Sequence, residues 1–147
     1  MENFIDYSKL SVGQLLCKKS IEINSNLVKN YLESTQDSSE MISDLDGNEY
    51  IPPMAIAAFG LQIVIDYLKI PHGTLHVGQE LVIESPLIIG ELIDYEASIA
   101  TNSVRNNWRF VTIEIISKTT EKNIVMTTKS TITMPVITPD HQGINHD

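Results

Sequence analysis

The most informative pattern in this chain is an almost uninterrupted apolar run at residues 51–70, which opens with two prolines. Pro53 suits the first position of a helix, because its φ angle is already helical and the amide hydrogen that it lacks would have no partner there. We therefore predict a helix over residues 54–68. The strongly polar side chains of the run are Gln62, Asp66 and Lys69. Their spacing places them on one narrow stripe, so the rest of the helix surface must be covered.

This helix is expected to lie inside the protein. The run is short for a membrane span and carries a charged stripe, so burial against other protein segments fits the pattern better. No second helix of this composition follows it. The substitution Ala58→Asp is predicted to prevent folding, because an unpaired charge on a buried helix costs several kcal/mol.

Segments with the period of a β-strand follow the helix. Strict alternation of apolar and polar residues runs through residues 91–101, 108–117 and 124–134. Less regular strands are predicted at 76–84 and, before the helix, at 15–23, with a short helix at 26–34 that Asn24 or Ser25 caps. Period-two alternation in consecutive segments joined by turns indicates antiparallel strands. The predicted fold class is therefore α+β, a long central helix wrapped by an antiparallel β-sheet.

The alternation also assigns side chains to one face of each strand. In the three regular strands this face is predicted to carry Arg109 and the apolar residues Ile93, Tyr95, Ala97, Ile99, Val111, Ile113, Ile115, Ile124, Met126, Ile132 and Met134. In the first strand it is predicted to carry Leu15, Cys17, Ile21 and Ile23. Residues on one face of a strand lie together on one side of the sheet.

The chain is predicted to form one domain over residues 1–135. Residues 136–147 are polar and terminal, so a flexible tail is expected there. The polar, acidic stretch at residues 35–50 is the longest irregular segment between elements. Loops of this length inside a compact domain are often functional.

Composition narrows the range of functions. The net charge is −9 over 147 residues and no basic stripe is present, which argues against a nucleic-acid partner. Cys17 is the single cysteine, and neither the acidic loop nor the pair His72 and His76 has the pattern of a metal site, so no metal or other cofactor is expected. The first residues show no signal peptide, which favours a cytoplasmic protein without a membrane partner.

The order of elements and several motifs resemble a known family. Strand, short helix, polar loop, long buried helix and a meander of long strands is the order of the hot-dog fold. The motifs are FIDYSKLSVGQ, LVKNYLESTQD, IPPMAIAAFG and LHVGQELVIESPLIIGELIDYEASI, and with the strands that follow them they span residues 4–134. They resemble the MaoC-like hydratases and dehydratases, and among these the N-terminal-type members called FAS1-like dehydratase domains.

This resemblance implies an activity and a substrate class. Members of the family add water to an enoyl thioester, or remove it from a 3-hydroxyacyl thioester, with (R) specificity. The acyl carrier is coenzyme A or acyl carrier protein, so an acyl-CoA or acyl-carrier-protein thioester is the implied partner. A carboxylate and an imidazole on the loop before the central helix move the protons, and backbone N–H groups at the start of that helix polarise the thioester carbonyl.

Two parts of this machinery are altered in the chain. The active loop of such enzymes reads approximately Asp-x-Asn-Pro-x-His. Its four specified positions carry Asp37, Ser39, Glu40 and Ile42 here, and residues 1–71 contain no histidine. Asp37 therefore matches the catalytic carboxylate, whereas Ile42 stands where the histidine is required. At the helix start Pro53 replaces a glycine, and proline has no N–H to donate. Losing one such donor costs about 100–1000-fold in rate.

These departures resemble the non-catalytic half of two-part members of the family, in which one hot-dog module binds the acyl chain and a second carries the acid/base pair. The implied assembly is a homodimer or a heterodimer with a catalytic hot-dog subunit. The residues expected to border the acyl chain are Met54, Ala57, Ala58 and Gly60. Packing of the helix against the strands is the alternative explanation for the three small residues.

Two other functions stay open, so whether the chain is itself an enzyme is not decided by its sequence. It is an active hydratase if Asp37 works with Glu40 or a water in place of the histidine. It is a non-enzymatic module if it binds acyl thioesters without turnover, since a fold alone does not determine a function. Turnover that disappears in Asp37→Asn would identify the first of these, and binding without turnover in any mixture would identify the second.

Overall fold

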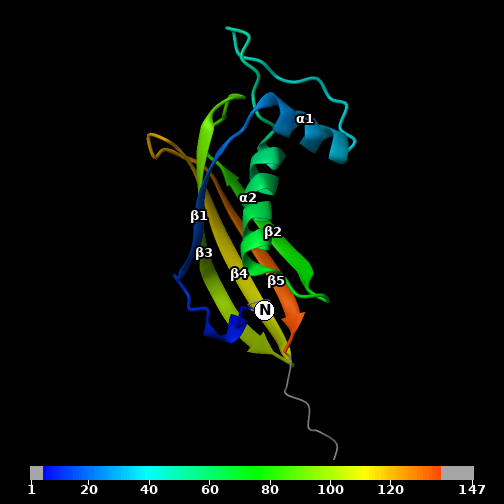
Figure 1. Ribbon diagram of the computed structural model, residues 1–147, viewed down its shortest axis with the longest axis vertical. Coiled ribbons are helices and arrows are strands. Elements are labelled where there is room, and N and C mark those ends of the chain that lie inside the picture. Colours follow the sequence, from blue (N-terminus) through cyan, green and yellow to red (C-terminus); the bar gives the residue numbers. More distant parts are fainter. Residues whose placement is uncertain (1–4, 137–147) are drawn as a thin grey trace, which may run out of the picture.

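The computed structural model describes residues 5–136. Its elements are η1 (Tyr7–Lys9), β1 (Leu15–Glu22), α1 (Ser25–Ser34), α2 (Pro53–Leu68), β2 (Leu75–Ile83), β3 (Leu92–Arg105), β4 (Trp108–Thr119) and β5 (Ile124–Pro135). In Figure 1 the strands form one long, curved sheet with α2 lying along one face of it, and α1 lies near the start of α2. Apart from Val136, the tail for which we predicted flexibility lies outside the described residues.

The sheet has the predicted antiparallel arrangement. Its strand order is β1-β3-β4-β5-β2, and every neighbouring pair is antiparallel. α2 packs against β1, β4 and β5, so helix and sheet form two layers with the core between them. The α+β architecture with a long central helix is therefore confirmed. Among residues 5–136, no helix is both long enough and apolar enough to cross a membrane.

Local sequence signals explain where the two α-helices begin and end. Asn24 caps α1, because its side-chain oxygen accepts a hydrogen bond from the N–H of Leu27 at 2.9 Å. Pro53 occupies the first position of α2, as predicted. Lys69 ends α2 in a left-handed backbone conformation with φ of 47°.

A tight turn makes the central hairpin longer than predicted. Asn106 and Asn107 both have positive φ angles, 51° and 65°, which is the conformation that two-residue hairpin turns require. Pairing between β3 and β4 therefore continues up to the turn, with Arg105 opposite Trp108. The predicted strand at 91–101 stopped short of this point.

The core contains most of the residues that were predicted to share one face of the strands. Among its members are Ile93, Tyr95, Ala97, Ile99, Val111, Ile113, Ile115, Met126, Ile132 and Met134. Two predictions at strand starts are wrong. A bulge in β1 leaves Leu16 buried and Leu15 exposed, and at the start of β5 Val125 is buried while Ile124 is partly exposed. A slip of one residue reverses the face of a side chain, and alternation alone does not show where such a slip occurs.

The tightest contact between the helix and the sheet is at Gly60. A Cβ atom at this position would lie 2.8 Å from Cε1 of Tyr95 and 3.3 Å from a methyl group of Ile115. The Tyr95 hydroxyl reaches past the glycine and donates a buried hydrogen bond to the carbonyl of Ile56 at 2.8 Å. Burial raises the pKa of this phenol above its ordinary value. Close packing of the helix against the sheet, the alternative explanation for Gly60, agrees with this contact.

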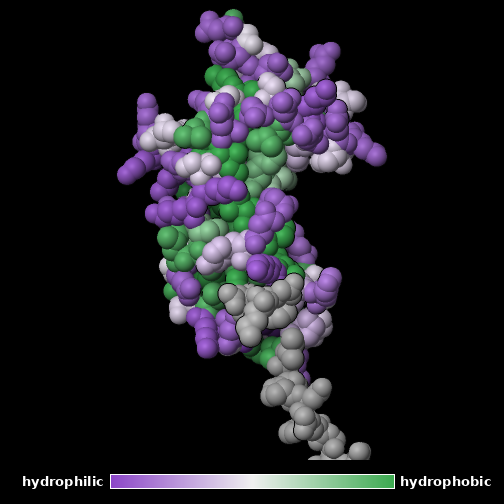
Figure 2. All heavy atoms as spheres, viewed as in Figure 1, coloured by the Kyte–Doolittle hydropathy of each residue, from purple (hydrophilic) through white to green (hydrophobic). Residues whose placement is uncertain are grey.

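The opposite side of α2 is uncovered within the single chain. Met54 and Ile65 are exposed and Ala58 is only half-buried. Figure 2 shows hydrophobic side chains gathered over the position of α2. Ala55, Ile56, Ala57, Gly60, Val64 and Leu68 are buried, and the exposed side includes Gln62 and Asp66 of the predicted polar stripe. Ala58 is half-buried, so Ala58→Asp is a weaker test of helix burial than a substitution at a buried position.

The adjacent pair Ala57 and Ala58 provides a matched test of the helix orientation. Ala57 is 4% exposed, so we predict that Ala57→Asp lowers the free energy of unfolding by about 3–5 kcal/mol, the cost of an uncompensated buried charge. Ala58→Asp should cost about 1 kcal/mol, since it carries the same loss of helix propensity on a half-buried side. Urea denaturation followed by circular dichroism measures both, and equal losses would contradict this orientation of α2.

Candidate functional site

A cavity of about 310 Å³ lies at the start of α2, and we call it the helix-start pocket. Its lining residues are Ile42, Tyr50, Ile51, Pro53, Ile56, Ile83, Glu84, Ser85, Pro86 and Leu87. They come from the acidic loop, the first turn of α2, the end of β2 and the segment that follows β2. The pocket therefore opens beside the loop that sequence analysis marked as functional.

Backbone hydrogen bonds hold the walls of the helix-start pocket together. The N–H of Ile51 donates to the carbonyl of Leu87 at 2.8 Å, and the N–H of Tyr50 donates to the carbonyl of Ile42 at 2.8 Å. A β-bridge pairs Tyr50 with Ile88. The loop before α2 is thus fastened to the segment after β2, so the pocket is built by backbone pairing as well as by side-chain packing.

The walls of this pocket are mainly aliphatic side chains and proline rings. Pockets that bind small molecules combine such walls with a few polar groups that orient the ligand. Here the polar side chains are those of Tyr50, Glu84 and Ser85, and none of them has a hydrogen-bonded acid/base partner among the described residues. The pocket is suited to holding an apolar chain, and its own walls supply little means of moving a proton.

Asp37, the predicted catalytic carboxylate, lies outside the walls of the helix-start pocket. Its side chain is exposed, just beyond α1, where its own N–H donates to the carbonyl of Leu32 at 2.9 Å. Hydrogen bonds from the hydroxyl and from the backbone N–H of Ser39 hold the pKa of this carboxyl below its ordinary value. A general base works best when its pKa is near the operating pH, and this shift moves Asp37 further from it.

Ile42, at the position where the histidine is required, borders the helix-start pocket with 73% of its side chain exposed. The histidines among the described residues are His72 and His76, and both are exposed beyond the other end of α2. A helix of 16 residues is about 24 Å long, so these imidazoles are far from the pocket. The pocket thus has an aliphatic side chain where the resemblance requires a proton carrier.

The start of α2 also has few free donors. Pro53 lines the helix-start pocket without an N–H, and the N–H of Ala55 is occupied by a hydrogen bond to the carbonyl of Pro52 at 2.9 Å. The N–H of Ile51, just before the helix, is used by Leu87. Of the backbone groups around the helix start, Pro53 has no N–H and those of Ile51 and Ala55 are engaged.

The residues predicted to border an acyl chain lie on two different sides of α2. Ala57 and Gly60 face the sheet and are buried, whereas Met54 and Ala58 lie on the uncovered side. None of the four lines the helix-start pocket, whose helix residues are Pro53 and Ile56. Sequence analysis did not predict that residues at and after the end of β2 line this pocket, because no local signal indicates that Ile83 and Leu87 meet the helix start.

The acidic loop forms a hairpin tip and no metal centre. The Asp44 carboxylate accepts hydrogen bonds from the N–H groups of Asp46 and Asn48, both at 2.9 Å, and Ser43 bridges to Glu49. Among residues 5–136 no group of three or more His, Cys, Asp or Glu side chains is arranged to hold a metal ion.

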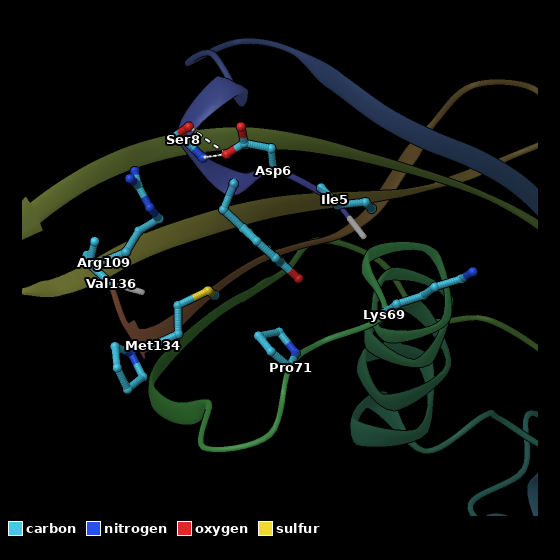
Figure 3. A pocket seen from close by; sticks show the side chains of 10 residues that line it. Ile5, Asp6, Ser8, Lys69, Pro71, Arg109, Met134 and Val136 are labelled. Atoms are coloured by element: carbon cyan, nitrogen blue, oxygen red, sulfur yellow. Dashed lines mark hydrogen bonds between the residues drawn. The ribbon is translucent and has the colours of Figure 1, made fainter. Parts of the chain in front are cut away.

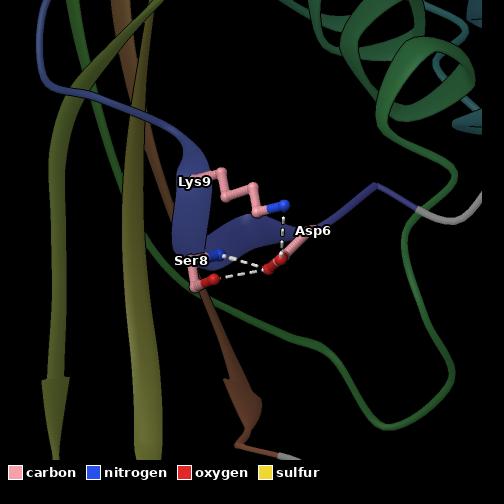
Figure 4. A network of polar contacts seen from close by, with 3 residues as sticks. All are labelled: Asp6, Ser8 and Lys9. Carbon is pink, nitrogen blue, oxygen red and sulfur yellow. Dashed lines mark hydrogen bonds and ion pairs between the residues drawn. The ribbon is translucent and has the colours of Figure 1, made fainter.

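A second cavity, of about 350 Å³, lies at the far end of α2. Figure 3 shows Met134 and Pro71 on one side of it and Asp6 and Ser8 on the other. The Asp6 carboxylate accepts hydrogen bonds from the hydroxyl and N–H of Ser8 and pairs with Lys9 at 3.9 Å, as Figure 4 shows. These hydrogen bonds hold the pKa of the Asp6 carboxyl below its ordinary value and stabilise the segment before β1. The carboxylate is therefore already occupied by neighbouring residues.

Comparison with known proteins identifies the fold. No protein-family profile and no curated protein sequence matches the chain. An (R)-hydratase from A. caviae involved in PHA biosynthesis has a similar structure, with a TM-score of 0.70 and 16% identity over 86% of this chain and 98% of that one. A MaoC-like dehydratase from Rhodospirillum rubrum has a TM-score of 0.66 and 15% identity, over 87% of this chain and 94% of that one.

A third similar structure contains two kinds of subunit. It is the HadBC complex, a 3R-hydroxyacyl-ACP dehydratase from Mycobacterium tuberculosis, with a TM-score of 0.66 and 11% identity over 79% of this chain and 90% of the matched chain. At these identities the comparisons establish the fold. The chain has the hot-dog fold predicted from its sequence, and the solved structures that share it include MaoC-like hydratases and dehydratases, as the resemblance indicated.

Proposed function

We propose that this chain is the acyl-binding half of a MaoC-like, (R)-specific enoyl-thioester hydratase or 3-hydroxyacyl-thioester dehydratase. The observation that carries the proposal is the helix-start pocket. It lies at the start of α2, where the resemblance puts the reacting groups, and its walls suit an acyl chain, yet Ile42 and Pro53 stand at two positions where the chemistry needs an imidazole and an N–H. The pocket retains the properties needed for binding and lacks those needed for proton transfer.

The solved structures with the same fold support this substrate class. Their names describe (R)-hydratases and a 3R-hydroxyacyl-ACP dehydratase, so a thioester carried by coenzyme A or acyl carrier protein is the substrate proposed for the present assembly. The two-subunit complexes among them are precedents for dividing the work between hot-dog chains. In such a division one chain provides the apolar pocket and the other provides the acid/base pair.

The uncovered surfaces of the chain support a second hot-dog subunit as its partner. β2 lies at one edge of the sheet and exposes about half of Leu75, Val77, Val82 and Ile83. The uncovered side of α2 adds Met54 and Ile65. A long apolar edge strand with unpaired backbone groups readily pairs with another chain, so association through β2 would cover both surfaces.

Two neighbouring residues of β2 provide a matched test of acyl binding. Ile83 lines the helix-start pocket and is 54% exposed, whereas Val82 is 56% exposed and lines a separate polar hollow beside Glu80 and Glu114. We predict that Ile83→Gln weakens binding of a medium-chain acyl-pantetheine thioester by about fivefold or more, because apolar contact with the chain is lost. Val82→Gln should leave the dissociation constant unchanged.

Isothermal titration calorimetry measures both dissociation constants. The thioester used here carries no phosphate, so the result reports on the acyl pocket alone. If the unaltered chain does not bind the thioester, the proposal is contradicted. Equal weakening of thioester binding in the two variants would contradict it as well.

The edge-strand partner is tested by Val77→Lys. Val77 lies on β2 and is 52% exposed, and a lysine there should oppose edge pairing, so we predict that self-association of the purified chain is lost. Val104→Lys is the matched control, because Val104 is 48% exposed on β3, which the strands β4 and β5 separate from β2. Sedimentation velocity gives the molecular mass of each variant. Equal masses for Val77→Lys and the unaltered chain would contradict association through β2.

A further inference from the structure

Four of the ten basic residues of this acidic chain line a single groove on the sheet, which we call the lysine groove. They are Lys18 and Lys19 from β1, Lys118 from the end of β4 and Lys122 from the turn between β4 and β5. The groove has a volume of about 400 Å³ and also contains Ser20 and the carboxylates of Asp94 and Glu96. The groove therefore brings Lys18, Lys118 and Lys122 near two carboxylates, whereas Lys19, which is paired with Tyr95, follows Lys18 on the opposite face of β1.

Strand pairing explains why these side chains meet. Ser20 is paired with Asp94 and Lys18 with Glu96 across β1 and β3, and Lys118 is paired with Asp94 across β3 and β4. Residues directly opposite each other, or one step removed on the same face, have side chains within reach of one another. The groove is thus fixed by the register of three adjacent strands.

The existing ion pairs leave the lysines available to a ligand. Lys18 and Lys118 lie 3.9 and 3.8 Å from Glu96, longer than a hydrogen bond, and Lys19 and Lys122 make no ion pair among the described residues. Exposed pairs of this kind contribute little to stability. Each ammonium group has three donors, so most of the donors in the groove are not committed to protein acceptors.

We propose that the lysine groove binds a small molecule that carries a diphosphate group. Lysine is a compact point charge suited to phosphate, and amines on opposite walls of one groove can contact two adjacent phosphates at once. The volume is in the range of small-ligand sites, and the polar walls suit a charged group better than an acyl chain. The surplus of positive charge is local, because the rest of the chain is strongly acidic.

The groove lies toward the same end of the molecule as the helix-start pocket. Leu87 lines that pocket, and the chain continues from it through Gly90, whose N–H donates to the carbonyl of Ile23 at 2.7 Å, directly into the first residues of β3. Asp94 and Glu96 alternate with the buried Ile93, Tyr95 and Ala97, so the groove lies on the face of the sheet away from α2. The phosphates of a coenzyme A thioester are one source of the ligand if the carrier passes around the edge of the sheet, an identification that rests on the proposed function. Free nucleoside diphosphates are the other source and do not depend on it.

The test compares two pairs of lysines with matched surroundings. Lys18 has an exposed ion pair at 3.9 Å and Lys122 has none, and outside the groove Lys9 has an exposed ion pair at 3.9 Å and Lys29 has none. The double variants Lys18→Gln with Lys122→Gln and Lys9→Gln with Lys29→Gln therefore remove the same charge. Binding of inorganic pyrophosphate to the full chain is measured by isothermal titration calorimetry at low salt.

We expect saturable binding of pyrophosphate that is weakened about tenfold or more in the groove variant and less than about twofold in the control variant. Equal weakening in both variants would mean that only the net charge matters and would overturn the proposal. The same holds if the unaltered chain does not saturate in the millimolar range.

Titrations with ADP and coenzyme A then distinguish the sources of the phosphate. Tighter binding of coenzyme A than of ADP, lost in the groove variant, supports the thioester carrier, and equal binding supports a free nucleotide. Since acyl-pantetheine carries no phosphate, its binding reports on the proposed function separately. If pyrophosphate binds and acyl-pantetheine does not, the phosphate site is supported and the proposed function is contradicted. If acyl-pantetheine binds and pyrophosphate does not, only the phosphate site is contradicted.

Discussion

The contact between Gly60 and the ring of Tyr95 determines how close α2 comes to the sheet. A Cβ atom at residue 60 would stand 2.8 Å from that ring, so only glycine allows the separation that the Tyr95 hydroxyl needs to reach the carbonyl of Ile56. Glycine in a helix costs about 1 kcal/mol relative to alanine, which the close packing and the buried hydrogen bond offset. Because Ile56 also lines the helix-start pocket, the same contact positions that pocket against the end of β2.

The proposed function separates the pocket that binds the acyl chain from the groups that carry out the reaction. Hydratases of this kind need a proton carrier and a donor to the thioester oxygen, each worth about 100-fold or more in rate. The family resemblance assigns these two places to Ile42 and Pro53, and Asp37 lies outside the pocket walls with its carboxyl pKa lowered by hydrogen bonds from Ser39. A chain that retains aliphatic walls and exposes an apolar edge strand fits the binding half of a two-part enzyme.

The periodicity of the sequence was sufficient to predict the fold, but it did not predict which residues line the helix-start pocket. Alternation identified the buried rows that include Ile93 and Val111, and Pro53 marked the first residue of α2. Leu15 and Ile124 were assigned to the wrong face because alternation does not locate bulges. The extent of the uncovered side of α2 could not be predicted for a different reason: an apolar helix surface looks the same whether the sheet or another chain covers it. The pocket wall at Ile83 and Leu87 follows from tertiary pairing, which has no local signature.

The most direct test of the central claim is the enoyl absorbance of a short-chain enoyl-CoA incubated with the purified chain alone, with Asp37→Asn as the paired sample. Since the proposed function assigns the acid/base pair to a second chain, the account predicts no loss of absorbance above the buffer rate and no difference between the two proteins. Turnover by the unaltered chain that disappears in Asp37→Asn would contradict it, because the exposed carboxylate would then be a working catalytic group.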